Sequence, residues 1–92
     1  MVLFKKGLAR QAKRSNITSF QARRIKSALH IIQNTPVDQL TQLERVKRIN
    51  VPNRDDIYVY RVDMRNRIVL SIDKNQDTAI VQSIVNADSL NV

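Results

Sequence analysis

The chain has 92 residues, which suffices for one small domain with a modest core. It contains no cysteine and a single histidine, His30, so we exclude a disulfide framework and expect no transition-metal site. Sixteen Lys and Arg residues against eight Asp and Glu residues give a net charge of +8, which favours binding to phosphate backbones or to an acidic protein.

The positive charge is unevenly distributed along the chain. Residues 1–34 contain eight Lys and Arg residues and no acid, whereas residues 35–92 contain eight basic and eight acidic residues. The excess is either an ordinary solvated surface or a binding surface for phosphate groups or an acidic partner. No apolar run reaches the roughly 18 residues of a membrane span, and the first residues lack the order of a secretory signal, so we expect a cytoplasmic protein.

The first 16 residues predict a strand followed by a helix. Residues 2–4 are apolar and are typical of a short strand. Residues 5–14 place apolar side chains on one side and basic ones largely on the other, as in an amphipathic helix. Ser15 and Asn16 prefer turns and end this helix.

A second, longer helix is predicted to run to about Asn34. Thr18 or Ser19 is suited to cap its first turn, and Pro36 ends it because a residue before proline disfavours helical backbone. Arg24 falls at the edge of the apolar stripe and is expected to extend its charged end to solvent. The stripe comprises Ile17, Phe20, Ile25, Ala28, Leu29 and Ile32.

The second half of the chain predicts a sheet. Residues 37–43 are expected to be irregular or to form one short turn, and residues 52–56 a loop. Four segments have the composition of strands: 44–51, 57–62, 67–72 and 78–85. Short connections imply antiparallel neighbours. We therefore predict one α+β domain over residues 1–92, in the order β-α-α-β-β-β-β, with a two-helix hairpin packed on one face of an antiparallel sheet.

Alternation along the strands assigns side chains to the two faces of this sheet. The face toward the helices is expected to carry Tyr60, Val62, Ile68, Leu70, Ile72, Ile80 and Ile84. The opposite face is expected to carry Arg61, Asp63, Arg67 and Ser71. Either Lys47 or Arg48 joins that face, because Val46 favours one register and its apolar neighbours favour the other.

Arg61 and Arg67 are the most informative residues of the outer face. With one of Arg45, Lys47 or Arg48 they are placed to converge on a phosphodiester. The planar guanidinium group suits phosphate, both in binding and in stabilising the extra negative charge of a transition state. The alternative is that they are ordinary outward residues of a one-sided sheet, with Asp63 as a nearby opposite charge.

The strand segments together resemble a known family. The segments are Ile57–Val62, Arg67–Ile72 and an apolar last strand that ends with Ile84–Asp88. Their order resembles that of the RelE/ParE superfamily, the toxins of bacterial type II toxin–antitoxin systems. The N-terminal segment Phe4–Ala12 and the long second helix fit the helical hairpin of this family. The resemblance covers nearly the whole chain and implies a RelE/ParE-like fold.

The resemblance implies one of two activities, cleavage of messenger RNA in the ribosomal A site or poisoning of DNA gyrase. It also implies a cognate antitoxin, whose C-terminal segment wraps the toxin, and no cofactor. In the nuclease branch Arg67 matches the arginine that contacts the scissile phosphate, and Arg61 matches a basic position. The catalytic candidates are therefore Arg61, Arg67 and Asp88, the last matching an acidic residue of some members. The candidates for nucleic-acid binding are Lys13, Arg14, Arg45, Lys47, Arg48 and Arg65.

The chain departs from the family at its C-terminal end. Nuclease members usually follow the last strand with a basic residue or histidine, and often a tyrosine, whereas residues 86–92 contain none of these. Arginine does not lose its proton in proteins, so Arg61 cannot act as a general base. Either Asp63 or Asp88 takes that role, or cleavage depends on orientation and charge alone, with the ribosome completing the site.

Three functions follow from these observations. The first is a ribosome-dependent mRNA interferase, an endoribonuclease that blocks translation by RNA binding and cleavage. The second is a gyrase inhibitor without nuclease activity, favoured by the missing C-terminal residues. The third is a non-toxic relative that serves as a binding module for nucleic acid or for an antitoxin.

Overall fold

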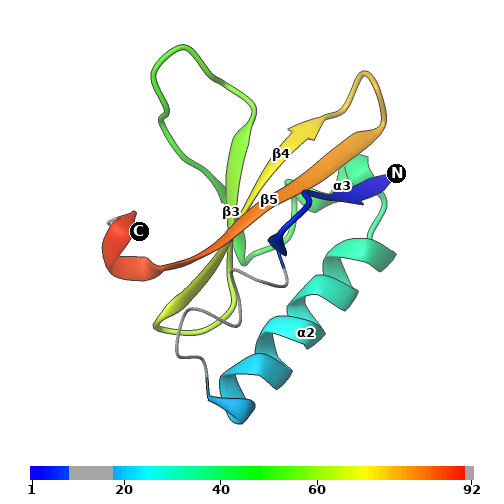
Figure 1. Ribbon diagram of the computed structural model, residues 1–92. Helices are drawn as coiled ribbons and strands as arrows, with labels where there is room; N and C mark the ends of the chain where they lie inside the picture. The colour runs from blue at the N-terminus through cyan, green and yellow to red at the C-terminus, as the bar shows by residue number, and fades with distance from the viewer. Residues whose placement is uncertain (9–17, 91–92) are drawn as a thin grey trace.

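The structure is a computed structural model and describes residues 1–8 and 18–90. One long helix packs diagonally across a twisted sheet (Figure 1). The helices are α2 (Ser19–Asn34), α3 (Val37–Leu40) and the 3-10 helix η1 (Ala87–Ser89). The strands are β1 (Val2–Phe4), β2 (Val46–Arg48), β3 (Ile57–Arg61), β4 (Asn66–Asp73) and β5 (Thr78–Asn86). The helix predicted over 5–14 falls mainly in residues 9–17, outside the described ranges. No helix in the described ranges is long and apolar enough to cross a membrane.

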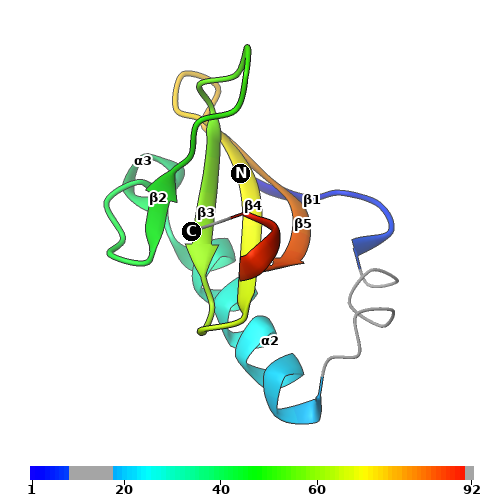
Figure 2. The same ribbon diagram turned by 90° about the vertical axis from the view of Figure 1, so that its left-hand side faces the viewer.

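The sheet has the strand order β1-β5-β4-β3-β2 (Figure 2). Strands β2 to β5 are antiparallel neighbours, as the short connections predict. Strand β1 instead pairs with β5 in parallel, with Val2 opposite Ala79, so the sheet is mixed. Short connections predict antiparallel pairs only for strands that are consecutive in the chain. Most of the chain separates β1 from β5, and a connection of that length permits a parallel pair. The predicted α+β fold is confirmed, and β1 adds a parallel edge.

The ends of α2 follow the sequence signals. Of the two predicted caps, Thr18 is used: its Oγ1 accepts from the Gln21 amide at 3.1 Å, and the Gln21 side chain accepts from the Thr18 amide at 3.2 Å. This reciprocal pair satisfies two amide groups that have no partner within the helix. The helix ends before Thr35 and Pro36, as predicted.

The core lies between α2 and one face of the sheet. Ile25, Ala28 and Ile32 of α2 are buried there, facing side chains of β3, β4 and β5. Phe20 was expected in the same stripe but is 61% exposed. The first turns of α2 extend beyond the end of the sheet, so none of the described strands covers this part of the helix (Figure 1). Ile17 is outside the described residues.

The predicted core faces of β3 and β4 are confirmed, whereas that of β5 is corrected. Ile80 was expected in the core with Ile84, but Ala79 and Val81 are buried and Ile80 is only half-buried. The cause is a β-bulge at Gln82, opposite the step from Val69 to Leu70. An extra residue in one strand reverses the alternation on one side of it, so residues 78–81 present the opposite set of side chains to the core.

Candidate functional site

Three arginines form a row across the end of the sheet. Arg61 of β3 is directly opposite Arg67 of β4. On the other side of β3, the Arg61 amide donates to the Arg45 carbonyl oxygen at 2.9 Å, which extends the ladder just before β2. Neighbouring Cα atoms in such a ladder are about 4.5–5.5 Å apart, so the three arginines extend from adjacent backbone positions.

The row borders a cleft of about 490 Å³. Arg24 of α2 reaches the same cleft from the other layer of the fold. Its lining consists of Arg24, Arg45, Arg61, Val62, Asp63, Met64 and Arg67. Among these described residues, four are cationic and one is acidic. The field inside therefore favours an anion, and guanidinium groups are suited to phosphate oxygens.

Backbone carbonyl groups fix two of the arginines. Arg67 is only 7% exposed, and its Nη1 donates to the carbonyl oxygens of Asp63 and Asn66. Arg45 Nη1 donates to the carbonyl oxygens of Arg61 and Val62, both at 3.1 Å. Carbonyl acceptors orient a guanidinium group without themselves neutralising it, so these contacts set the positions of Arg45 and Arg67 at the cleft.

Asp63 holds the turn between β3 and β4. Its Oδ1 accepts from the amides of Arg65 and Asn66, both at 2.8 Å, and the Asn66 side chain donates to its two oxygens at 3.2 Å. Burial alone would raise the pKa of Asp63, but these hydrogen bonds and the charge of Arg24 outweigh it, and the pKa is lowered. A carboxylate with a lowered pKa is a weak base, so this geometry argues against Asp63 as the general base.

The register of β2 decides between Lys47 and Arg48. Val46 is buried and opposite Tyr60, so it faces the core. Lys47, opposite Val59, consequently lies on the outer face with Arg61. Arg48 lies on the other face, and its Nη1 donates to the Asp55 carbonyl oxygen at 3.5 Å. Of the two candidates, Lys47 is therefore the one that lies on the same face of the sheet as the arginine row.

The other predicted site residues lie outside the cleft. Arg65 is exposed in the β3–β4 turn, and its carbonyl oxygen accepts from the Ala87 amide at 2.7 Å. Asp88 is exposed in η1, where its amide donates to Asn86 Oδ1 at 3.0 Å. Asp88 is thus near the turn but is not among the described residues that line the cleft. Lys13 and Arg14 are outside the described residues.

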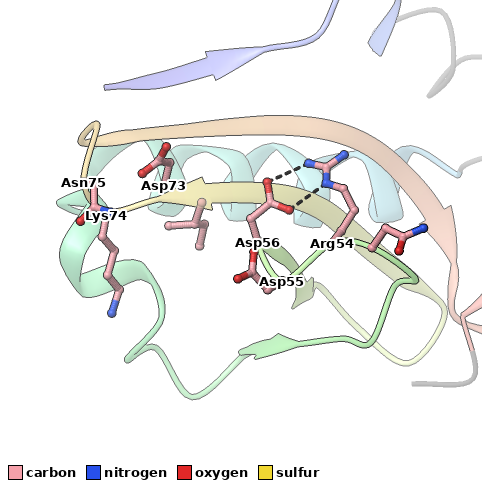
Figure 3. Close-up of a pocket in the computed structure, with 8 residues that line it drawn as sticks. Arg54, Asp55, Asp56, Asp73, Lys74 and Asn75 are labelled. Carbon is pink, nitrogen blue, oxygen red and sulfur yellow. Dashed lines mark hydrogen bonds and ion pairs between the residues drawn. The ribbon is translucent and has the colours of Figure 1, made fainter.

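A second hollow, of about 470 Å³, lies at the opposite end of the sheet, between the β2–β3 loop and the β4–β5 turn (Figure 3). Arg54 there forms two hydrogen bonds of 2.8 Å with Asp56, through Nε and Nη2. These bonds hold the pKa of Asp56 below its usual value. Three carboxylates, those of Asp55, Asp56 and Asp73, stand against the two cations Arg54 and Lys74 in this lining, so the hollow is less suited to phosphate than the arginine cleft.

Arg24 is the site residue that the sequence prediction missed. Its guanidinium carbon lies 4.5 Å from the centroid of the Phe20 ring, a cation–π contact at the start of α2. Its position at the edge of the apolar stripe could have indicated this role, because a residue at the edge of the buried side of a helix lies next to the sheet that the helix covers. Only the packing of α2 places it beside Arg61 and Arg67.

Comparisons with known proteins agree on the fold. No protein-family model matches the sequence, and no curated protein matches it closely enough to be a relative. Among solved structures, a chain of the RelB–RelE antitoxin–toxin complex from Methanococcus jannaschii matches with a TM-score of 0.63 and 17% identity, over 97% of this chain and 94% of that one. A chain of the RelE–RelB complex from Pyrococcus horikoshii OT3 matches with a TM-score of 0.63 and 15% identity, over 92% and 91%. YafQ from E. coli BL21(DE3) matches with a TM-score of 0.66 and 9% identity, over 98% and 96%. The predicted RelE-like fold is therefore confirmed.

Proposed function

We propose that this RelE-like chain is the toxin of a type II toxin–antitoxin module and that it cleaves messenger RNA on the ribosome. The observation that carries the proposal is the arginine row, with Arg61 opposite Arg67 and Arg24 at the same cleft. Like charges directly opposite each other destabilise a sheet. Guanidinium groups that line one cleft are suited to the phosphate groups of a polyanion.

The arginines are suited to the charge that develops when RNA is cleaved. The ribose 2′-oxygen bonds to the adjacent phosphorus, the bond from phosphorus to the 5′-oxygen breaks, and the 2′-proton leaves while the 5′-oxygen gains one. Negative charge on the phosphoryl oxygens increases on the way to the transition state. Guanidinium groups already fixed by backbone carbonyls, as in Arg45 and Arg67, stabilise that charge with little reorganisation.

Proton transfer is the weaker part of this site. Arginine does not act as a base, and the carboxylate of Asp63 accepts four hydrogen bonds in the turn. Among the described residues that line the cleft, Asp63 carries the one carboxylate. We infer that the chain orients the phosphodiester and that water or a group of the ribosome accepts the 2′-proton, so cleavage depends on the ribosome.

The proposal includes an antitoxin partner and a cytoplasmic site of action. Two of the similar structures are complexes of RelE with RelB. A chain with a net charge of +8 is suited to an acidic partner that neutralises it until release. No cofactor enters the proposed step, because the charge stabilisation is assigned to arginine side chains.

Cell-free bacterial translation tests the proposal directly. The purified chain is expected to stop protein synthesis, and primer extension on the message should detect new 5′ ends that appear only with ribosomes. Arg61→Ala removes an exposed arginine and is expected to reduce inhibition at least about tenfold, the scale of one oriented charge. Lys74→Ala, an equal charge change at the far end of the sheet, is the matched control. Undiminished inhibition by Arg61→Ala would contradict the proposed site.

Gyrase inhibition is the second candidate function. It is favoured by one observation: Asp88 lies outside the cleft, and no histidine or tyrosine is among the described residues of its lining. Such a site binds a phosphate backbone more readily than it catalyses cleavage. Intact messages together with loss of gyrase supercoiling would favour this reading over the nuclease.

A further inference from the structure

One flank of α2, at the border between its buried and its exposed side, carries an apolar strip beside the arginine cleft. Phe20 is 61% exposed and Ile31 is 46% exposed. They are 11 residues apart, which is close to three helical turns, so they lie on the same side of α2. Ser27 and Ala28 lie between them and are small. The strip therefore has two large apolar ends and a low centre.

The low centre opens into a hollow of about 470 Å³ between α2 and the end of β3. Three buried core residues contribute to its lining: Ala28 of α2, Tyr60 of β3, and Val62, which directly follows β3. Phe20 and Ile31 border it along the helix. Small residues on a helix permit close approach of a second helix, and an apolar hollow between two bulky residues accommodates one large apolar side chain.

Basic residues complete the lining of this hollow. Arg23, Arg24 and Arg45 line it, and no acidic residue is among its described lining residues. None of these three arginines forms an ion pair with a carboxylate of the described chain. The surface is thus apolar in the centre and positive around it. The complementary ligand is an amphipathic helix with apolar residues on one face and flanking Asp or Glu.

Two arginines belong to both hollows. Arg24 and Arg45 line the apolar hollow on α2 and also the arginine cleft at the end of the sheet. A carboxylate bound to them from one side lowers the positive field on the other. Binding at the two hollows is then mutually unfavourable, and the effect is reciprocal because it is a difference in binding free energies.

We propose that the hollow on α2 binds an acidic amphipathic helix of a partner protein, and that this helix weakens phosphate binding in the arginine cleft through Arg24 and Arg45. The partner's apolar side chain inserts between Phe20 and Ile31, and its carboxylates contact the two shared arginines. The inference rests on the proposed function in identifying this partner as the antitoxin. The surface and its coupling to the cleft are properties of the described residues.

The binding surface is tested with a synthetic peptide of leucines at helical spacing flanked by glutamates, labelled for fluorescence anisotropy. A peptide of the same composition in scrambled order has the same charge but no apolar face. The ordered peptide is expected to bind at least about tenfold more tightly, since a buried apolar anchor contributes 1.4 kcal/mol or more. Equal binding of the two peptides would mean nonspecific charge attraction and would overturn the proposal.

Two variants of α2 locate the site. Ile31→Glu places a negative charge in the apolar strip and is expected to weaken the ordered peptide about tenfold or more. Ala22→Glu makes the same charge change at an exposed position of α2 outside the hollow, and is expected to leave its affinity within about twofold. Circular dichroism confirms that both remain folded. Equal weakening in the two variants would place the peptide elsewhere.

Coupling to the cleft is measured with a labelled single-stranded RNA oligonucleotide. Saturating peptide is expected to weaken RNA binding about fivefold or more, the lower end of typical coupling between sites. Arg24→Ala should weaken both ligands. Ile31→Glu should lose the peptide and weaken RNA binding more than Ala22→Glu does, because its carboxylate lies in the hollow that Arg24 and Arg45 also line. Peptide and RNA that bind independently would overturn the coupling. Failure of the proposed function is a different result: the peptide binds at α2, but the chain leaves translation unaffected.

Discussion

At the scale of single residues, the carboxylate of Asp63 borders the basic cleft but forms its hydrogen bonds within the β3–β4 turn. Its oxygens accept from two amides and one side-chain amide in the β3–β4 turn, and its own carbonyl accepts from Arg67. The residue therefore connects the turn to the arginine that the turn positions. From the sequence, Asp63 was predicted to lie on the outer face of the sheet, either as an opposite charge near the arginines or as a general base. Its contacts instead identify it as a residue that stabilises the turn.

Replacement of Asp63 by Asn is expected to destabilise the fold by about 1–3 kcal/mol, because the turn amides lose a charged acceptor. The loss should depend on pH. The pKa of Asp63 is lowered in the folded chain, so its contribution is complete above its unfolded pKa of about 3.9 and is lost as pH falls through the folded value. Urea unfolding of both proteins from pH 7 to pH 2 should show the difference shrinking below about pH 4. A constant difference would contradict this assignment.

At the scale of elements, α2 has two roles. Its inner side supplies Ile25, Ala28 and Ile32 to the core, and its second turn presents Arg24 to the cleft. The first turn projects past the sheet, so its order depends on the capping box more than on packing (Figure 2). A local capping contact therefore supports a distant part of the candidate site.

Thr18→Ala is expected to lower the free energy of unfolding by about 0.5–2 kcal/mol, because the Gln21 amide loses its acceptor. Fraying of the first turn should also weaken RNA binding, because Phe20 of that turn contacts the Arg24 guanidinium group. Thr18→Ser retains the hydroxyl group and should restore both properties. Chemical denaturation and RNA anisotropy on the three proteins make the comparison. Destabilisation by the serine variant equal to that of alanine would show that the hydroxyl is not the cause.

At the scale of the whole molecule, the basic residues of the candidate site lie together at one end of the sheet. The row, Arg24 and Lys47 lie around the β3–β4 end, whereas the opposite end carries the acidic hollow of Asp55, Asp56 and Asp73. Among the described residues of the sheet, basic side chains thus gather at the β3–β4 end, and acidic side chains outnumber basic ones in the hollow at the other end. A polyanion is expected to approach by the β3–β4 end, at a rate and affinity that depend on ionic strength.

The salt dependence of RNA affinity measures how many phosphates the cleft neutralises. For single strands the logarithm of the binding constant falls with a slope of about −0.7 per neutralised phosphate, so three or four contacts predict a slope of roughly −2 to −3. Arg24→Ala should reduce the slope by about 0.7, and Lys74→Ala should leave it unchanged. Anisotropy titrations across a range of sodium chloride concentrations provide both values. A slope near zero would exclude phosphate recognition by this surface.

Features that depend on neighbouring residues were predictable from local sequence pattern. The helical period and the Thr18 signal located α2, and alternation assigned the core faces of β3 and β4. The pairing of Arg61 with Arg67 was also accessible, because a short turn joins their strands. Each of these follows from backbone geometry over a few residues, which local side-chain pattern reports well.

Features that depend on contacts between residues distant in the chain became clear from the folded structure. The bulge at Gln82 is set by how β5 fits β4, and the parallel place of β1 by a crossover. The choice of Lys47 over Arg48 came from the burial of Val46 against the core. Arg24 joined the cleft because α2 packs diagonally across the sheet (Figure 1). The physical reason is common to all four: burial and pairing with remote segments override the local alternation that a sequence displays.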